Sequence, residues 1–213
     1  MTDVALFPIP GSVNFPGVPC PLHVFEPRYR QMVKHCVDSG MLMGVCHTEK
    51  VVHESPREQD LKQALASNQS TYKPCQVFSA GAVSLLEELD DGRVVIEVAM
   101  NERLRLCEQQ QTLPFNIWRC ESLPDQQATP ASELALQQAQ EKIMRRLSIL
   151  THGVEELEGV IDSDFWQTMS ARTFSFSVMG LLGFEPEMSQ FLLEMTDPVQ
   201  RLNAVLTALN QSA

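Results

Sequence analysis

Apolar and polar positions follow two different periods along the chain, and the period changes near Pro124. Before this residue, short segments alternate apolar and polar positions, which is typical of strands with one buried face. After it, apolar residues return every three or four positions, which is typical of amphipathic helices. We therefore predict an α+β protein, with a β-rich pseudo-barrel and one helix over residues 1–124 and a helical bundle over residues 125–213.

The opening segment, residues 6–30, holds six of the 13 prolines of the chain. Proline fixes φ and removes a hydrogen-bond donor, so this segment is neither a helix interior nor a central strand. Its large apolar side chains, among them Phe7, Phe15 and Phe25, are too numerous for a free tail. We expect an extended segment that turns at fixed points and packs into the sheet.

The helix of the first part is predicted to begin at Pro27, because proline suits the first position of a helix. An apolar stripe follows at helical spacing, and Gly40 ends the pattern. The stripe consists of Tyr29, Met32, Val33, Cys36 and Val37. Directly after the helix, residues 41–46 have the composition of a short buried strand.

Residues 75–122 are rich in strand patterns. Asp91-Gly92 separates two apolar segments and predicts a hairpin, because this dipeptide tolerates the positive φ values of a type I′ turn. Residues 103–107 and 115–120 alternate with a period of two, so we expect a small, curved or barrel-like sheet. Residues 47–74 are polar and weakly patterned, and we expect a flexible insertion there.

The second part has the pattern of about four helices. Thr129-Pro130 is a helix start, and an acidic turn at residues 153–159 separates that long helix from one capped by Ser163. Two further helices are expected to open at Glu185-Pro186 and at Asp197-Pro198.

Several segments carry a resemblance to a known family. Leu-Phe-Pro-x-Pro-Gly from Leu6, then Phe-Pro-Gly from Phe15 and Phe-Glu-Pro-Arg-Tyr-Arg from Phe25, resemble the start of the Lon protease N-terminal domain family. The match is to stand-alone members that lack the ATPase and protease domains, and residues 197–202 are similar to the family's final helix. The resemblance implies a PUA-like fold that recognises polypeptides, such as unfolded or damaged proteins, or that acts as an adaptor, without a cofactor.

Composition and charge narrow the classes of partner. The chain carries a net charge of −11, which disfavours phosphate backbones and anionic lipid as partners. We therefore expect no nucleic acid and no membrane partner, and the six scattered cysteines without an export signal indicate a cytoplasmic protein with reduced thiols. The expected partners are other polypeptides, either an unfolded substrate or a protease or chaperone; an oligomer stays open.

The common sequence motifs of nucleotide-binding and catalytic sites are absent. The chain has neither a P-loop nor a Gly-x-Gly-x-x-Gly fingerprint nor a Gly-x-Ser-x-Gly elbow, so we predict a non-catalytic protein with no cofactor. Cys46, His47, Glu49 and His53 lie close together, but scattered ligands in a polar loop rarely form a zinc site. The acidic residues between 155 and 164 are interpreted as a solvated turn, because they lack the spacing of a calcium loop. We expect no metal site.

The candidate polypeptide-binding residues are Phe25, Glu26, Arg28, Tyr29 and Arg103. The first four stand where the opening segment meets the helix, and capping and packing would also explain them. Two other functions stay open. An RNA-binding module would agree with a PUA-like barrel, and an unrecognised hydrolase would show a pocket with strongly shifted pKa values.

Overall fold

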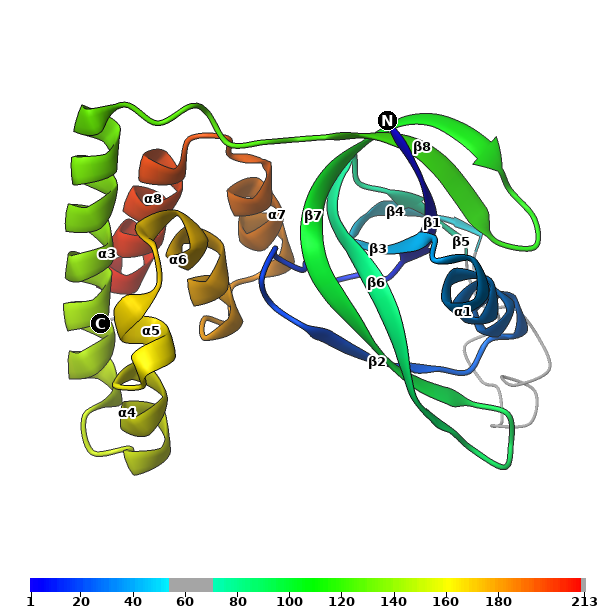
Figure 1. The fold of residues 1–213 in the computed structure, drawn as a ribbon, viewed down its shortest axis with the longest axis horizontal. Helices are drawn as coiled ribbons and strands as arrows, with labels where there is room; N and C mark the ends of the chain where they lie inside the picture. Colours follow the sequence, from blue (N-terminus) through cyan, green and yellow to red (C-terminus); the bar gives the residue numbers. More distant parts are fainter. Residues whose placement is uncertain (54–70, 212–213) are drawn as a thin grey trace. The chain divides into compact units, whose positions relative to one another are not determined.

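The computed structural model describes residues 1–53 and 71–211 (Figure 1). Contacts divide the chain into two units. The β unit consists of Met1–Leu123 and Phe184–Leu193, and the helical unit consists of Pro124–Gly183 and the chain from Glu194 onward. The grouping differs from the predicted division after Pro124 in one segment, since residues 184–193 pack with the β-rich part.

The main sheet of the β unit has six strands, in the order β2-β7-β6-β3-β1-β8. Because β8 pairs with β7 as well as with β1, the five strands other than β2 close into a barrel, which confirms the predicted barrel-like sheet. The strands are β1 (Thr2–Pro8), β2 (Cys20–Val24), β3 (Leu42–Cys46), β6 (Val77–Glu88), β7 (Val94–Gln111) and β8 (Asn116–Ser122).

The strand β7 is a single element of 18 residues, although the sequence analysis treated the segment after the Asp91-Gly92 hairpin and the alternating residues 103–107 separately. One end of β7 pairs with β2 and β6, and the other end pairs with β6 and β8. Register shifts between Leu106 and Glu108 and between Gln109 and Gln111 interrupt the pairing with β8. Such bulges bend a strand, which allows one long strand to serve both ends of the barrel.

The hairpin between β6 and β7 forms where it was predicted, but with a different turn. The Gly92 N–H donates to the Leu89 carbonyl at 2.8 Å, and the Leu89 N–H donates to the Arg93 carbonyl at 2.8 Å. Gly92 has a φ of 82°, and no described residue other than glycine has a positive φ. The type I′ prediction is therefore wrong, because that turn needs positive φ at both central residues. In the three-residue loop Asp90-Asp91-Gly92, only the glycine adopts a positive φ.

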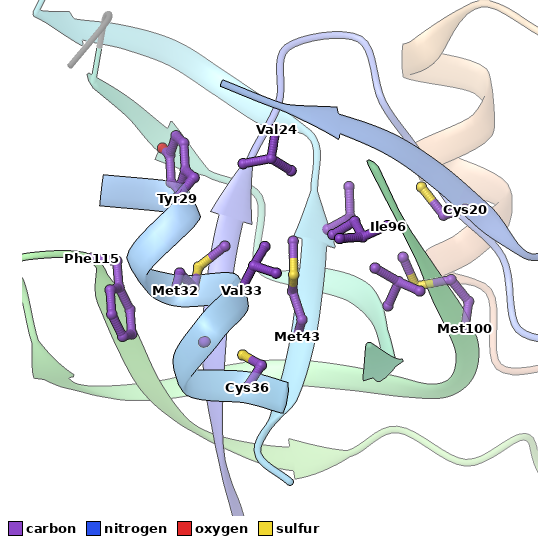
Figure 2. Packing of buried hydrophobic residues seen from close by; sticks show 13 residues of the cluster. Cys20, Val24, Tyr29, Met32, Val33, Cys36, Met43, Ile96, Met100 and Phe115 are labelled. Carbon is purple, nitrogen blue, oxygen red and sulfur yellow. The ribbon is translucent and has the colours of Figure 1, made fainter. Parts of the chain in front are cut away.

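The helix α1 (Pro27–Ser39) covers one face of the barrel (Figure 2). Pro27 begins it and Gly40 follows its end, with the Gly40 N–H donating to the Cys36 carbonyl at 2.9 Å. Tyr29, Met32, Val33 and Cys36 are buried against strand residues such as Val24, Met43 and Ile96. Val37 was predicted in the same stripe, but it is exposed.

The opening segment between β1 and α1 packs as predicted. Phe15 is buried, the Gly17 N–H donates to the Met100 carbonyl at 2.6 Å, and the Ser79 hydroxyl donates to the Asn14 carbonyl at 2.6 Å. These bonds satisfy backbone groups of the part that lies between the strands.

The expectation that the segment forms no central strand is wrong at its start, because Leu6 to Pro8 belong to β1, which lies between β3 and β8, and Pro8 is its last residue. Pro21 lies in β2, an edge strand, where proline is tolerated.

The segment predicted as a flexible insertion, residues 47–74, is described only at its ends. There, β4 (Thr48–His53) and β5 (Thr71–Pro74) form a separate two-stranded antiparallel sheet. Residues 54–70 lie outside the described part of the chain.

The described helices of the second half number six, more than the predicted four. They are α3 (Pro130–Thr151), α4 (Glu155–Ile161), α5 (Asp164–Thr168), α6 (Ala171–Ser177) with a 3-10 turn at Val178–Gly180, α7 (Pro186–Glu194) and α8 (Pro198–Gln211). The single helix expected after Ser163 is split, because Met169 and Ser170 are extended and the Ser170 hydroxyl accepts from the Thr173 N–H to begin a new helix. The helix α4 occupies the predicted acidic turn.

Candidate functional site

Four of the five predicted site residues come together at the start of α1. The Arg28 guanidinium lies 3.0 Å from the Glu26 carboxylate and 4.5 Å from the centre of the Tyr29 ring. The Tyr29 ring is buried against Phe7, with 4.0 Å between ring centres. Phe25 is exposed and Arg28 is half-buried, so these two present atoms to solvent, whereas Glu26 and Tyr29 are buried.

The fifth predicted residue, Arg103, lies inside the β unit. Its guanidinium donates to the Leu123 carbonyl at 2.8 Å and to the Leu193 carbonyl at 3.0 Å, and its side chain is buried. These bonds join β7 to the end of α7, which also bonds to the barrel through Gln190 and the Val77 carbonyl at 2.9 Å. These contacts give Arg103 a structural role within the β unit, and neither of them lies at the start of α1.

A groove of about 440 Å³ lies between α1 and the far half of the β6–β7 hairpin, and we call it the α1 groove. Its apolar lining consists of Pro27, Val33 and Val37 from α1, Leu85 from β6 and Val94 from β7. Val37 and Leu85 are 45% and 47% exposed, so the groove presents apolar side chains to solvent that no described residue covers. Volumes of about 300–1,000 Å³ are usual for ligand sites.

The polar rim of the α1 groove is balanced in charge. Arg30 Nη1 donates to the Gly92 carbonyl at 3.0 Å, which links α1 to the hairpin turn. Lys34 Nζ lies 2.9 Å from the Asp38 carboxylate, and this bond raises the pKa of Lys34, with Glu88 adding in the same direction. Two cations and two carboxylates therefore offset each other, and the groove combines an apolar floor with a rim of no net charge.

Beside this groove, the described part of the chain gives the strand β6 a strand neighbour on one side only, and α1 lies near this part of the strand. Its pairing with β3 covers Ser79 to Gly81 only, whereas its pairing with β7 continues to Glu88. Among the residues that the structure describes, Ala82–Glu88 is thus paired on one side. An open strand edge can pair with an added extended chain through backbone hydrogen bonds.

The sequence analysis did not identify Val37 or Leu85 as site residues. Consecutive Leu85-Leu86 in a predicted strand was a usable signal, because neighbouring residues point to opposite faces and one of them lacks a buried partner. Only the fold shows that α1 lies beside Leu85.

The cysteines are poor candidates for a nucleophile. Burial raises the pKa of the Cys20 thiol to about 11 and the pKa values of Cys36 and Cys120 to about 12. The thiolate is the reactive form, so these groups react slowly near neutral pH. Cys107 is exposed, whereas Cys46 and Cys75 are buried.

We therefore expect one fast-reacting thiol in the native protein. At about pH 8, a thiol reagent such as dithionitrobenzoate should modify Cys107 quickly, and the other five cysteines only after denaturation. Cys107→Ser should remove the fast phase. A fast phase that persists in this variant would contradict the burial of the others.

The residues considered for zinc have separate partners. The His47 ring accepts from the Gly11 N–H at 2.9 Å, Glu49 pairs with Lys73, and the Cys46 thiol donates to the His47 carbonyl at 3.0 Å. The side chain of His53 lies outside the described part. Over residues 1–53 and 71–211, no group of three or more His, Cys, Asp or Glu side chains is placed to hold a metal ion.

The helices of the described ranges are all too short or too polar to cross a bilayer.

Comparison with known proteins shows the family to which the chain belongs. Residues 3–211 match the family model of the ATP-dependent protease La (LON) substrate-binding domain. A Lon protease of Paraburkholderia phytofirmans is 26% identical over 207 residues, which is 96% of this chain and 24% of that protease. The chain therefore spans about a quarter of the length of this curated relative.

Two solved structures share the fold. The N-terminal domain of a Mycobacterium avium complex Lon protease superposes with a TM-score of 0.69 at 13% identity, covering 99% of this chain and 98% of that one. A Lon N-terminal domain protein from Xanthomonas campestris gives a TM-score of 0.57 at 20% identity, covering 97% of this chain and 98% of that one. At these identities the likeness concerns the fold.

Proposed function

The chain belongs to the family of ATP-dependent protease La (LON) substrate-binding domains, and from this premise we propose that it binds unfolded polypeptide segments in the α1 groove. The observation that carries the proposal is an exposed apolar groove beside a strand edge that is paired on one side. An extended segment placed there would bury apolar side chains against Val37 and Leu85. Its backbone would pair with Ala82–Glu88.

The two parts of this site suit an unfolded chain. Backbone hydrogen bonds do not depend on sequence, and an apolar floor with a neutral rim accepts many side chains. A folded protein keeps its apolar side chains and backbone groups inside, so an unfolded one is the partner that can supply both. Phe25 and Arg28, at the start of α1, would extend the contact surface beyond the groove.

Three cationic side chains of the β unit already have carboxylate partners, which favours a polypeptide over a nucleic acid as the ligand. Arg28 pairs with Glu26, Lys34 with Asp38, and Arg105 with Glu121 at 3.3 Å. Phosphate binding needs clustered cations whose charge is not already offset. The net charge of −11 acts in the same direction.

Leu85→Glu is expected to weaken the binding of fluorescein-labelled casein, an unfolded polypeptide, by on the order of tenfold or more, about 1.4 kcal/mol. The substitution places a charge on the apolar wall of the groove, where a bound chain would have to desolvate it. Fluorescence anisotropy measures the dissociation constant, and hydrogen exchange should show new protection of the Ala82–Glu88 amides in the complex.

Leu86→Glu is the matched control, because Leu86 is the neighbouring residue, is 60% exposed and does not line the groove. It should bind casein as the unmodified protein does. Equal weakening by both substitutions, or no casein binding by the unmodified protein, would contradict the proposal.

A further inference from the structure

The exposed apolar side chains of the helical unit are concentrated in one short stretch. Six of its seven large apolar residues that are exposed in the described structure lie between residues 149 and 165, where α3 ends and α4 and α5 follow (Figure 1). We call these six the α4 patch. They are Ile149, Leu150, Val154, Leu157, Val160 and Phe165, with exposed fractions between 41% and 66%.

Only part of the apolar surface of the helix α4 is buried within the helical unit. Ile161 is buried, while Leu157 and Val160, on the adjoining part of the same helix, are exposed. In α5 the division repeats, because Trp166 is buried and Phe165, whose ring meets it edge-on at 5.7 Å, is exposed. Single exposed apolar residues are ordinary, but a group of them marks an interaction surface.

The segment that carries the α4 patch is mainly acidic, although Arg145 and Arg146 lie just before it on α3. Residues 147–168 contain five carboxylates and neither lysine nor arginine. The five are Glu155, Glu156, Glu158, Asp162 and Asp164. All but Glu158 are exposed, and the Glu158 carboxylate accepts from the Gly153 N–H at 2.9 Å, so four carboxylates face solvent among the apolar side chains.

We propose that the α4 patch binds a cationic amphipathic helix of a partner protein. The apolar stripe of such a helix would cover the exposed side chains, and the lysines and arginines that flank the stripe would meet the carboxylates. A second copy of this chain fits poorly, because a two-fold contact would bring one acidic patch against another. This surface is separate from the α1 groove, and the proposal does not rest on the function proposed for that groove.

The test uses a labelled leucine-lysine peptide, about five helical turns long, whose leucines form one stripe. We expect it to bind the full chain, and the double substitution Leu157→Gln/Val160→Gln to weaken binding on the order of tenfold or more. Leu134→Gln is the matched control, because Leu134 is 57% exposed on α3 of the same unit and lies outside the patch. It should leave the dissociation constant unchanged.

A second set of measurements separates the contribution of apolar contacts to binding from the contribution of charge. A peptide of the same composition with scrambled order, and one with glutamate in place of lysine, should both bind at least about tenfold more weakly. Glu155→Gln/Glu156→Gln should lower the affinity of the leucine-lysine peptide at about 0.05 M salt and change it little at about 0.5 M salt, where charges are screened.

Three results would overturn the proposal. One is equal affinity for the ordered and scrambled peptides, which would mean attraction by net charge only. Another is equal weakening by Leu134→Gln and by the double substitution. The third is a dimer of the unmodified chain in sedimentation that Leu157→Gln/Val160→Gln dissociates, since the patch would then bind a second copy.

Discussion

Arg201→Met is expected to lower the free energy of unfolding of the helical unit by about 3–5 kcal/mol. Arg201 lies in α8 with its side chain fully buried. Its guanidinium pairs with the Asp125 carboxylate, donates to the Ser175 hydroxyl at 2.6 Å and to the Met195 carbonyl at 2.7 Å, and lies 3.7 Å from the centre of the Phe176 ring. Burial lowers the pKa of Arg201, and its bonds to Asp125 offset only part of this effect.

The loss of stability would come mainly from the Asp125 carboxylate, which the substitution leaves in place. Methionine fills much of the volume, but the Asp125 carboxylate stays nearly buried without its strongest partner, and Arg172, at 3.8 Å, is only a partial replacement. A buried charge that loses its partner costs more than the pair contributed. The double substitution Asp125→Leu/Arg201→Met should therefore be more stable than Arg201→Met alone.

The two tryptophans allow each unit to be followed by itself. Trp118 lies in β8 of the β unit and Trp166 in α5 of the helical unit. With Trp118 replaced by phenylalanine, urea unfolding followed by fluorescence reports the helical unit around Arg201. A loss below about 1 kcal/mol, or a double variant less stable than the single one, would contradict this account of the pair.

Gly81→Ala is expected to destabilise the β unit by about 3 kcal/mol. Gly81 lies in β6 opposite the middle of β7, and a Cβ added there would lie 1.6 Å from the Ala99 carbonyl oxygen and 2.4 Å from its carbon. These are backbone atoms of the central strand, so the clash is relieved only by moving β7, which pairs with three other strands.

Gly159→Ala is the matched control for this substitution. Gly159 lies within α4, and nothing comes within 4 Å of a Cβ added there. Alanine should stabilise this helix by about 0.5–1 kcal/mol. Urea unfolding followed through Trp118, with Trp166 replaced by phenylalanine, measures the effect on the β unit. An unchanged unfolding midpoint in Gly81→Ala would contradict the close approach of the two strands.

Elements whose ends are set by local chemistry could be predicted from the sequence. Pro27 and Gly40 bound α1 at the expected residues, and the Thr129 hydroxyl accepts from the Ser132 N–H at 3.1 Å at the start of α3. The continuity of β7 could not be predicted, because Asn101 and Glu102 interrupt the apolar pattern and tolerate either a turn or an exposed strand. Pairing with β6 decides between them, and that pairing is remote in sequence.

The candidate site was harder to predict, because polarity alone does not say where a side chain goes. Arg103 has the charge of a surface residue, yet carbonyls at Leu123 and Leu193 bind it inside the β unit, and the second of these is 90 residues away in sequence. Val37 and Leu85 have the polarity of core residues, yet both line an open groove. Each outcome depends on which elements become neighbours.

The segment Phe184–Leu193 has a consequence for how the protein is made. The β unit needs the carbonyl of Leu193 and the amide of Gln190 to satisfy Arg103 and the Val77 carbonyl, but the whole of Pro124–Gly183 is translated first. Domains generally fold as they leave the ribosome, at about 5–20 residues per second. During translation the β unit therefore lacks residues 184–193 for several seconds after its first 123 residues have been made. We expect nascent chains halted near residue 124 to bind chaperones most strongly.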